Sequence, residues 1–267
     1  MSLFQLILVA LIQGLTEFLP VSSSGHLILL PNLTGMDDQG QAIDVAVHIG
    51  TLFAVIMFFW ADVKIAIGGT GRLLQGKVDT KGAHLALQLG IATIPVMIFG
   101  LVLKLTGLDQ ALRSVTVIGW TMLIFGLVLY WADQKGATTK TSPDWSIKDA
   151  LIMGVWQALA LVPGTSRSGA TISGARQLGY AREDAAKLSM LMSIPTIIAS
   201  GAVLGLDVVS TANIQLAKDS LIAAVFAFVA ALLALSLMMR LLKTVSFTPY
   251  VIYRVFLGIG LLVFAYS

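Results

Sequence analysis

Six long apolar stretches constrain the fold of this chain more than any other feature. They cover about residues 43–61, 84–103, 114–132, 185–206, 219–239 and 249–266. Each is long enough to cross the hydrocarbon core of a bilayer, which takes roughly 17–25 residues of helix. Only 12% of all residues are charged, against about 25% in a typical soluble domain, so the chain cannot form a water-facing shell. The sequence therefore predicts an all-α polytopic membrane protein with six transmembrane helices.

The distribution of charge predicts how these helices are oriented. The chain has a net charge of only +3 and no cysteine, so we expect no nucleic-acid partner, no disulfide and no cysteine-ligated metal. If the 61–83 loop is cytoplasmic, the cytoplasmic side holds Lys64, Arg72, Lys77, Lys81, Lys135, Lys140, Lys148, Arg176, Arg182, Lys187, Arg240 and Lys243, and the other side holds Lys104, Arg113 and Lys218. Because cytoplasmic loops carry the excess of Lys and Arg, both termini are predicted to face the periplasm or exterior.

Two further apolar stretches, residues 2–16 and 150–162, are too short to span the membrane comfortably. Each leads into a polar break, FLPVSSSGH at 18–26 and VPGTSRSG at 162–169, and then into another short segment. Non-helical backbone is tolerated at membrane depth only where it is buried in protein or lines a wet cavity. We therefore expect two re-entrant helical hairpins, at 2–34 and 148–178.

The two halves of the chain resemble each other. A shift of 144 residues aligns 13–15 with 157–159 and the serines and glycine of 22–25 with 166–169. Each copy contains one hairpin and three spans, and because three is odd, the second copy must be inserted upside down. The prediction is a single membrane domain, 1–267, built as an inverted-topology repeat of 1–132 and 147–267. The hairpin tips then approach from opposite faces and meet near the midplane.

The breaks contain the polar residues that are most costly inside a membrane, and such residues indicate a functional site. They are Glu17, Ser22, Ser23, Ser24 and His26 in the first break, and Ser166, Arg167, Ser168 and Thr171 in the second. An arginine fork, hydroxyl groups and the exposed N–H groups of glycine-rich turns suit a phosphate. A carboxylate would repel that phosphate unless a divalent cation lay between them, as Mg²⁺ does in many phosphate sites. His26 is close enough in sequence to serve a serine as acid or base.

Structural interpretations of the same residues remain open. Small and hydroxylated residues often mediate close helix packing in membranes, and this interpretation applies to Ser24, Ser168 and Gly169. Glu17 and Arg167 can form a purely structural ion pair. Arg254 is interpreted as a core ion-pair partner or a snorkelling residue, and His48 as a hydrogen-bonded core histidine or a residue that lines the site.

Two motifs resemble those of a known family. QGLTEFLPVSSSGH at 13–26 resembles the (E/Q)xxxE-type motif of bacterial undecaprenyl-diphosphate phosphatases of the bacitracin-resistance type, and PGTSRSGAT at 163–171 resembles their PGxSRSxxT motif. The resemblance covers essentially the whole chain. It implies a multi-pass phosphatase of the bacterial cytoplasmic membrane that hydrolyses undecaprenyl diphosphate, recycles the lipid carrier for peptidoglycan synthesis and confers bacitracin resistance. It also implies dependence on a divalent cation, Mg²⁺ or Ca²⁺, and a site that opens outward.

The resemblance also assigns roles by motif position. The implied catalytic residues are Glu17, Ser23 as nucleophile, His26 and Arg167, with Glu17 as metal ligand; the implied substrate-binding residues are Gln13, Ser22, Ser24, Gly164, Ser166, Ser168 and Thr171. Gln13 departs from the pattern, since many members carry Glu there, and Glu17 is then the one acidic ligand.

Two other function classes compete with a phosphatase. A lipid-carrier transporter or flippase uses the same inverted repeat and needs only binding groups. A structural or drug-resistance membrane protein needs no chemistry at all. The oligomeric state stays open.

Overall fold

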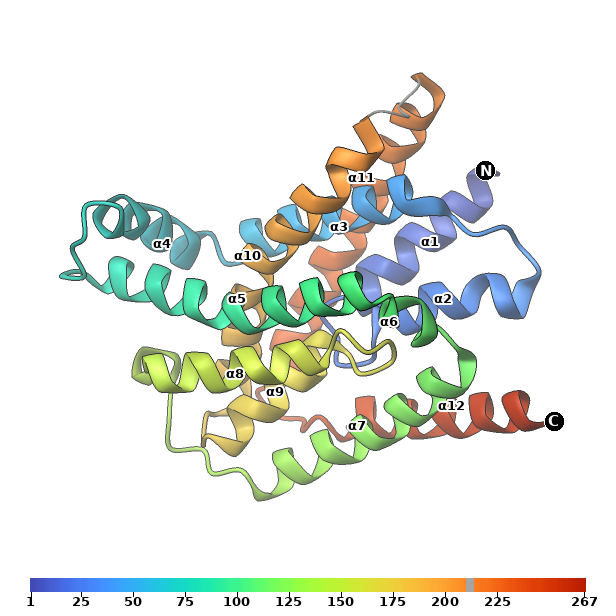
Figure 1. The fold of residues 1–267 in the computed structure, drawn as a ribbon. Coiled ribbons are helices and arrows are strands. Elements are labelled where there is room, and N and C mark those ends of the chain that lie inside the picture. Colours follow the sequence, from blue (N-terminus) through green and yellow to red (C-terminus); the bar gives the residue numbers. More distant parts are fainter. Residues whose placement is uncertain (210–213) are drawn as a thin grey trace.

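The computed structural model describes residues 1–209 and 214–267, and Figure 1 shows that they fold into helices. Six of these described helices are long and apolar enough to cross a membrane: α3 (Gly40–Phe58), α5 (Lys81–Thr106), α7 (Val115–Lys135), α10 (Arg182–Val209, with the span taken over Arg182–Ala202), α11 (Ile214–Leu241) and α12 (Thr248–Tyr266). They coincide with the six apolar stretches of the sequence. The prediction of an all-helical, multi-pass membrane protein is confirmed.

The outward faces of these helices are apolar, as a lipid environment requires. Phe53 on α3, Leu233 on α11 and Phe256 on α12 are 59%, 65% and 74% exposed, respectively. Between helices, small residues bring backbones close together: a side chain at Gly50 would collide with the backbone of Ala224 on α11. Close contacts through small residues are how helices associate in membranes, where lipid tails remove most of the hydrophobic driving force.

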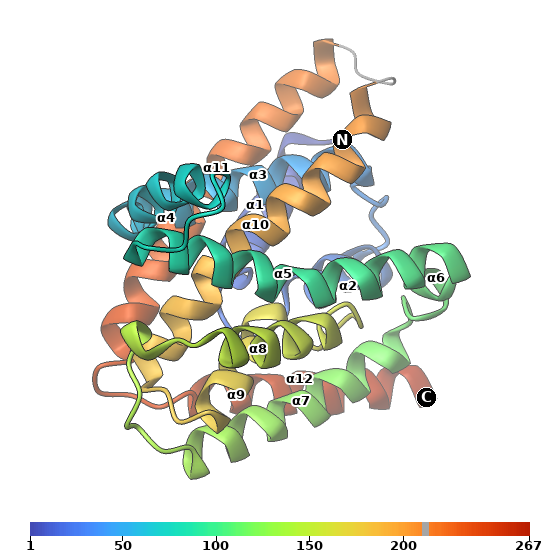
Figure 2. The same ribbon diagram turned by 60° about the vertical axis from the view of Figure 1, so that its left-hand side comes forward.

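Two pairs of shorter helices accompany the six long ones. α1 (Leu3–Thr16) and α2 (Ser23–Thr34) flank the first polar break, and α8 (Ile147–Leu159) and α9 (Arg167–Gln177) flank the second. Figures 1 and 2 show both breaks in the interior of the helix assembly. They are in direct contact there, because the Ser168 hydroxyl donates a hydrogen bond to the Leu19 carbonyl at 2.9 Å.

The two breaks have the same local geometry. Ser22 and Ser166 have φ angles of 73° and 72°, a region that residues other than glycine rarely adopt. Each serine then caps the helix that follows, and its hydroxyl accepts a hydrogen bond from the backbone N–H of Gly25 at 3.3 Å or of Gly169 at 3.1 Å. The cap satisfies a backbone donor that water cannot reach, which helps to offset the strain of the turn.

In each half, the first short helix packs on the second long helix of the other half. α1 packs on α11, whereas α8 packs on α5; α3 also packs on α11, and α10 on α5. α3 contacts α10, and α7 contacts α12, so corresponding spans of the two halves also meet. Each half is therefore buried largely against the other, and neither forms a separate core.

The segment 61–83, expected as a loop, contains a further helix, α4 (Trp60–Leu73). It packs on α5, where Gly69 lies so close to Gly82 that neither position has room for a side chain. After α5 the chain continues through the short α6 (Leu108–Ala111). The connection from α7 to α8 contains a short 3₁₀ helix, η1 (Ser142–Asp144), where hydrogen bonds from the Thr141 backbone and hydroxyl hold the pKa of Asp144 below its usual value.

A buried charge cluster fixes the far end of α9. Arg176 on α9 is 1% exposed and lies 3.2 Å from the Asp133 carboxylate of α7, which also binds Arg182 at 2.7 Å. The remaining donors of Arg176 bind carbonyls in the last turn of α7 and in the chain between α7 and α10. Because α9 begins at Arg167, in the second break, this cluster at its other end also helps to position that break.

Candidate active site

Glu17 lies at the centre of a hydrogen-bonded cluster formed by both breaks. Its Oε1 atom accepts a hydrogen bond from Arg167 Nη2 at 2.6 Å. Its Oε2 atom accepts one from the Ser23 hydroxyl at 2.5 Å and another from Gln13 Nε2 at 2.9 Å. The structure thus brings together four of the residues that the motifs singled out, although Arg167 follows Glu17 by 150 positions.

A cavity of about 210 Å³ opens beside this cluster. Its polar lining consists of Glu17, Ser22, Ser23, Ser24, His48, Gln157, Ser166, Arg167, Thr196 and Ser200. Within the part of the chain that the structure describes, Arg167 Nη1 and Gln13 Oε1 are buried without a hydrogen-bond partner. Gln157 Oε1 is also without a partner there, and both Arg167 and Gln157 line the cavity, whereas Gln13 lies behind Glu17. Buried polar atoms are normally satisfied, so a free donor and a free acceptor on residues that line the cavity indicate that a ligand completes the cluster.

The other hydroxyl groups of the second break hold the structure together. Ser166 lines the cavity, and its hydroxyl lies 3.1 Å from that of Ser168. Ser168 binds the first break through the carbonyl of Leu19, and Thr171 lies 2.6 Å from the hydroxyl of Ser189 on α10. Neither Ser168 nor Thr171 lines the cavity. The structural interpretation fits Ser168, and the same holds for Thr171.

Gly164 is also part of the turn and not of the cavity lining. It has a φ angle of 87°, and a side chain there would collide with Thr121 and Ile118 of α7. Its carbonyl accepts a hydrogen bond from Arg254 Nη2 at 3.0 Å. Glycine is required here for the turn and for the close approach of α7.

Arg254 on α12 joins the two breaks. It is fully buried, and its guanidinium donates to Pro20 O of the first break at 3.2 Å and to Thr165 O of the second at 2.9 Å. Further bonds reach Gly164 and carbonyls of α7. No carboxylate pairs with it among the described residues, so the expectation of a core ion pair or a snorkelling side chain was wrong. Arg254 does not line the cavity, and its role is to hold the two breaks together.

His26 does not contact Ser23. Its Nδ1 lies 2.7 Å from Ser22 O, and because a carbonyl only accepts, Nδ1 carries the hydrogen. Its Nε2 then accepts a hydrogen bond from the Tyr253 hydroxyl at 2.6 Å, and the two rings are stacked. Both nitrogens are occupied, so the expected pair of Ser23 and His26 is not formed. The proton of Ser23 points to Glu17 instead.

His48 of α3 lines the cavity and is also hydrogen-bonded, which combines the two interpretations of the sequence. Its Nδ1 donates to the Asp44 carbonyl at 2.7 Å, and its Nε2 lies 3.9 Å from Glu17 Oε2. Gln157 of α8 corresponds to Gln13 in the repeat and lines the cavity too. Motif reasoning did not single out Gln157, although its alignment with Gln13 was the available signal.

Comparisons with known proteins identify the family of this chain. The sequence model of the family described as "Bacitracin resistance protein BacA" matches residues 6–260, a range that includes both breaks. The chain belongs to the BacA family. It is 72% identical to the undecaprenyl-diphosphatase of Dinoroseobacter shibae and 71% identical to that of Roseobacter denitrificans, over the full length of each protein. It is 46% identical to undecaprenyl-diphosphatase 1 of Rhodospirillum rubrum, covering all of this chain and 96% of the relative.

In this BacA-family protein, Glu17 and Gln13 are the residues of the site that could hold a divalent cation. The described residues contain no group of three or more His, Cys, Asp or Glu side chains able to hold an ion. Glu17 and the unpartnered Gln13 Oε1 nevertheless offer oxygen ligands one helical turn apart. Mg²⁺ typically binds one or two carboxylates and completes its coordination with substrate phosphates and water. Glu17 and Gln13 alone would therefore leave most of the coordination of such an ion to substrate and water.

Proposed function

We propose that this protein is an undecaprenyl-diphosphatase, which releases the terminal phosphate of undecaprenyl diphosphate and leaves undecaprenyl phosphate. It thereby recycles the lipid carrier for peptidoglycan synthesis and confers bacitracin resistance. The observation that carries this function is the contact of the Ser23 hydroxyl with Glu17 Oε2 at 2.5 Å, beside the partly unpaired guanidinium of Arg167. The named relatives support the same substrate.

Ser23 and Glu17 carry the first half of the reaction. Glu17 Oε2 takes the hydroxyl proton as the Ser23 oxygen attacks the terminal phosphorus, and the bond to the leaving undecaprenyl phosphate breaks. The proton leaves with that product. Arg167 holds the phosphate through Nη1, which has no other partner in the described chain, and through Nη2. A planar fork of donors suits the oxygens of a phosphoryl group and stabilises the charge that develops on them.

Water completes the reaction. It attacks the phosphoserine, Glu17 accepts the proton of that water, and the bond between phosphorus and the Ser23 oxygen breaks. Inorganic phosphate leaves, and Ser23 recovers its proton. Ser22, Ser24 and Ser166 line the cavity and add donors for the diphosphate, while Ser168, Thr171 and Gly164 keep the second break in shape. His26 holds the carbonyl of Ser22 and acts as a positioning residue.

A divalent cation, Mg²⁺ or Ca²⁺, belongs to the proposal. Glu17 and Gln13 Oε1 are the residues that would hold it. When bound, the cation neutralises negative charge on the diphosphate and lets a carboxylate approach it. The chain's own residues then bind and orient the diphosphate, and Glu17 deprotonates the Ser23 hydroxyl, as described above.

The inverted repeat and the re-entrant hairpins are part of the same proposal. The equal φ angles of Ser22 and Ser166 support a repeat whose halves are 1–132 and 147–267. So does the exchanged packing of α1 on α11 and of α8 on α5. We propose that hairpins 2–34 and 148–178 enter from opposite faces of the bacterial cytoplasmic membrane. Both termini lie at one end of the helix assembly (Figure 1), which supports their lying on the same side of the membrane. The excess of Lys and Arg on the opposite side supports the periplasm as the side of the termini, and we propose that the site opens there too.

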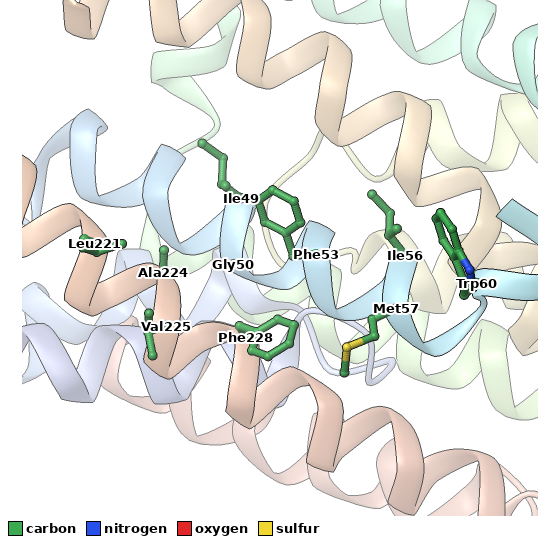
Figure 3. Close-up of a pocket in the computed structure, with 10 residues that line it drawn as sticks. All are labelled: Ile49, Gly50, Phe53, Ile56, Met57, Trp60, Leu221, Ala224, Val225 and Phe228. Atoms are coloured by element: carbon green, nitrogen blue, oxygen red, sulfur yellow. The ribbon is translucent and has the colours of Figure 1, made fainter. Parts of the chain in front are cut away.

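The apolar surroundings of the site suit a polyisoprenyl chain. A cavity of about 560 Å³ between α3 and α10 shares His48, Ile197 and Ser200 with the polar cavity. One residue after His48, Ile49 begins a second apolar groove of about 720 Å³ between α3 and α11, where Phe53, Trp60 and Phe228 are among the residues that line it (Figure 3). A lipid whose diphosphate occupies the polar cavity can leave its tail along α3, in contact with the membrane.

Release of inorganic phosphate separates this function from its main alternative. Paired short helices that break inside the protein are also an architecture of transporters, which favours a flippase as the second candidate. The experiment incubates detergent-purified protein with undecaprenyl diphosphate and Mg²⁺ and measures free phosphate. A phosphatase releases one phosphate per lipid, whereas transport alone releases none, and the Ser23→Ala variant is the matched control.

A further inference from the structure

We propose that His48 is a ligand of the divalent cation through Nε2, beside Glu17 Oε2 and Gln13 Oε1. The site then favours a metal that accepts imidazole, such as Mn²⁺ or Co²⁺, over Ca²⁺. This inference rests on the proposed function, because it concerns the same site. It goes further in naming a nitrogen ligand on α3, outside both motifs.

The hydrogen bond of His48 is the first observation. Nδ1 donates to the Asp44 carbonyl one turn earlier at 2.7 Å, so the lone pair of the neutral ring is on Nε2. Metal-binding histidines almost always donate their other ring N–H to a carboxylate or carbonyl, which fixes the tautomer and the orientation of the ring. His48 already has this arrangement, and it lines the cavity.

The position of Nε2 is the second observation. It lies 3.9 Å from Glu17 Oε2. Two ligand atoms that each lie about 2.1 Å from one ion are separated by roughly 3.0 Å when they subtend 90° and by about 4.2 Å when they are opposite. The observed separation falls within this range, and it is too long for a direct hydrogen bond. One ion can therefore bind both atoms, with an angle of roughly 136° between them.

The amide of Gln13 is the third observation, and it is independent of His48. Gln13 is fully buried, and its Nε2 donates to Glu17 Oε2 at 2.9 Å. Because a carboxylate only accepts, the amide nitrogen must face Glu17, and Oε1 remains without a partner among the described residues. An amide oxygen is a suitable ligand for a divalent cation. Gln13 does not itself line the cavity, but it lies behind Glu17, and its Oε1 would add a second oxygen to the carboxylate of Glu17 and the imidazole nitrogen of His48.

The other two histidines differ in ways that make them controls. The Nε2 of His26 is occupied by the Tyr253 hydroxyl. His84 donates from Nδ1 to Thr80 O at 3.0 Å, as His48 does to Asp44 O, but it lies in the first turn of α5 at an exposed position and does not line the cavity. His84 thus has the same internal hydrogen bond without the neighbouring carboxylate.

The ligand set determines the metal preference. Ca²⁺ and Mg²⁺ are hard ions that favour oxygen, whereas imidazole suits first-row transition metals. We expect the protein to bind Mn²⁺ and Co²⁺ more tightly than Ca²⁺. The variant His48→Gln, which replaces the nitrogen by an amide oxygen, should weaken Mn²⁺ binding at least about tenfold. The ratio of the affinities for Mn²⁺ and Ca²⁺ should therefore become smaller.

Pulsed electron paramagnetic resonance of bound Mn²⁺ tests the ligand directly. The full-length protein is purified in detergent, stripped of metal and titrated with Mn²⁺ alone, and hyperfine coupling to nitrogen is recorded. The wild-type protein should show coupling to ¹⁴N, and growth with ¹⁵N-histidine should convert it to ¹⁵N coupling without any mutation. The coupling should disappear in His48→Gln and persist in His84→Gln.

Two results would overturn the inference. One is wild-type protein without histidine nitrogen coupling, and the other is a coupling that survives in a folded His48→Gln variant. Phosphate release from undecaprenyl diphosphate with Mg²⁺, measured on the same wild-type sample, separates this failure from that of the proposed function. Phosphate release without nitrogen coupling removes His48 from the site and leaves the phosphatase intact. Nitrogen coupling in a sample that releases no phosphate with any divalent metal would instead contradict the proposed phosphatase function.

Discussion

The contact between Ser23 and Glu17 leads to a specific prediction for the variant Glu17→Gln. The substitution keeps the volume of the side chain but replaces one carboxylate oxygen by an NH₂ group. The three hydrogen bonds that Glu17 accepts, from Arg167, Ser23 and Gln13, compete for the single oxygen that remains. The loss of the negative charge also removes the base for the Ser23 hydroxyl.

The expected loss follows from these contacts. A positioned general base contributes about 10²–10⁴ in rate, so kcat should fall by this factor, equivalent to roughly 2.7–5.4 kcal/mol of barrier. The chain's other glutamate, Glu183, lies in the first turn of α10 outside the cavity and provides the matched control. Glu183→Gln should retain wild-type kcat. The assay is initial-rate phosphate release from undecaprenyl diphosphate by detergent-purified protein at saturating lipid and Mg²⁺.

A double-variant comparison distinguishes Glu17 from His26 as the base. Groups that act as a unit show strongly non-additive effects. Glu17→Gln combined with Ser23→Ala should therefore be little worse than the worse single variant. The same comparison with His26→Gln in place of Glu17→Gln tests whether Ser23 and His26 act as a pair, as their spacing in the sequence predicts. Retention of more than about a tenth of kcat in Glu17→Gln, or non-additivity only in the His26 pair, would refute Glu17 as the base.

Three further predictions concern residues around this centre. Arg167→Lys supplies a point charge without a fork, so kcat should fall by about 10²–10³, and near-native turnover would remove Arg167 from the site. Arg254→Met leaves three break carbonyls without their donor at about 1–3 kcal/mol each, so thermal unfolding in detergent should occur at a clearly lower temperature, and an unchanged midpoint would contradict this. Single cysteines test the orientation, at the exposed positions Gln75, which follows α4, and Ala111, at the end of α6. In intact cells Gln75→Cys should react only with membrane-permeant thiol reagents and Ala111→Cys also with impermeant ones; the reverse pattern would invert the orientation.

The sequence was sufficient to predict the spans because the rule behind them is one of length and composition. A run of about twenty apolar residues has few alternatives to a membrane helix. The approach of Glu17 to Arg167 was also predictable, because each follows a short helix that cannot cross the membrane alone. Helix α4 was not predicted. Its segment carries polar residues at its ends, and the decisive contact, Gly69 on Gly82, involves residues without side chains.

The details of the site depend on side-chain directions that spacing does not determine. His26 follows Ser23 by three positions, which places both residues on one face of α2, yet the ring turns to Tyr253 of α12. Arg254 binds backbone carbonyls, and because every residue has one, no sequence pattern identifies such partners. The place of His48 beside Glu17 results from the packing of α3 near the first break, which no local motif encodes.

The central claim is that Ser23 takes the terminal phosphate of the lipid onto its own oxygen. The most direct measurement is a single-turnover reaction in which excess protein meets undecaprenyl diphosphate labelled in its terminal phosphate, followed by acid quenching within milliseconds and mass-spectrometric mapping of the labelled peptide. We expect the label on Ser23, and we expect Ser23→Ala to carry no label and to release less than about a hundredth of the wild-type phosphate. A label on another residue, or an unlabelled Ser23→Ala protein that retains more than about a tenth of the activity, would contradict the account and favour direct attack by water.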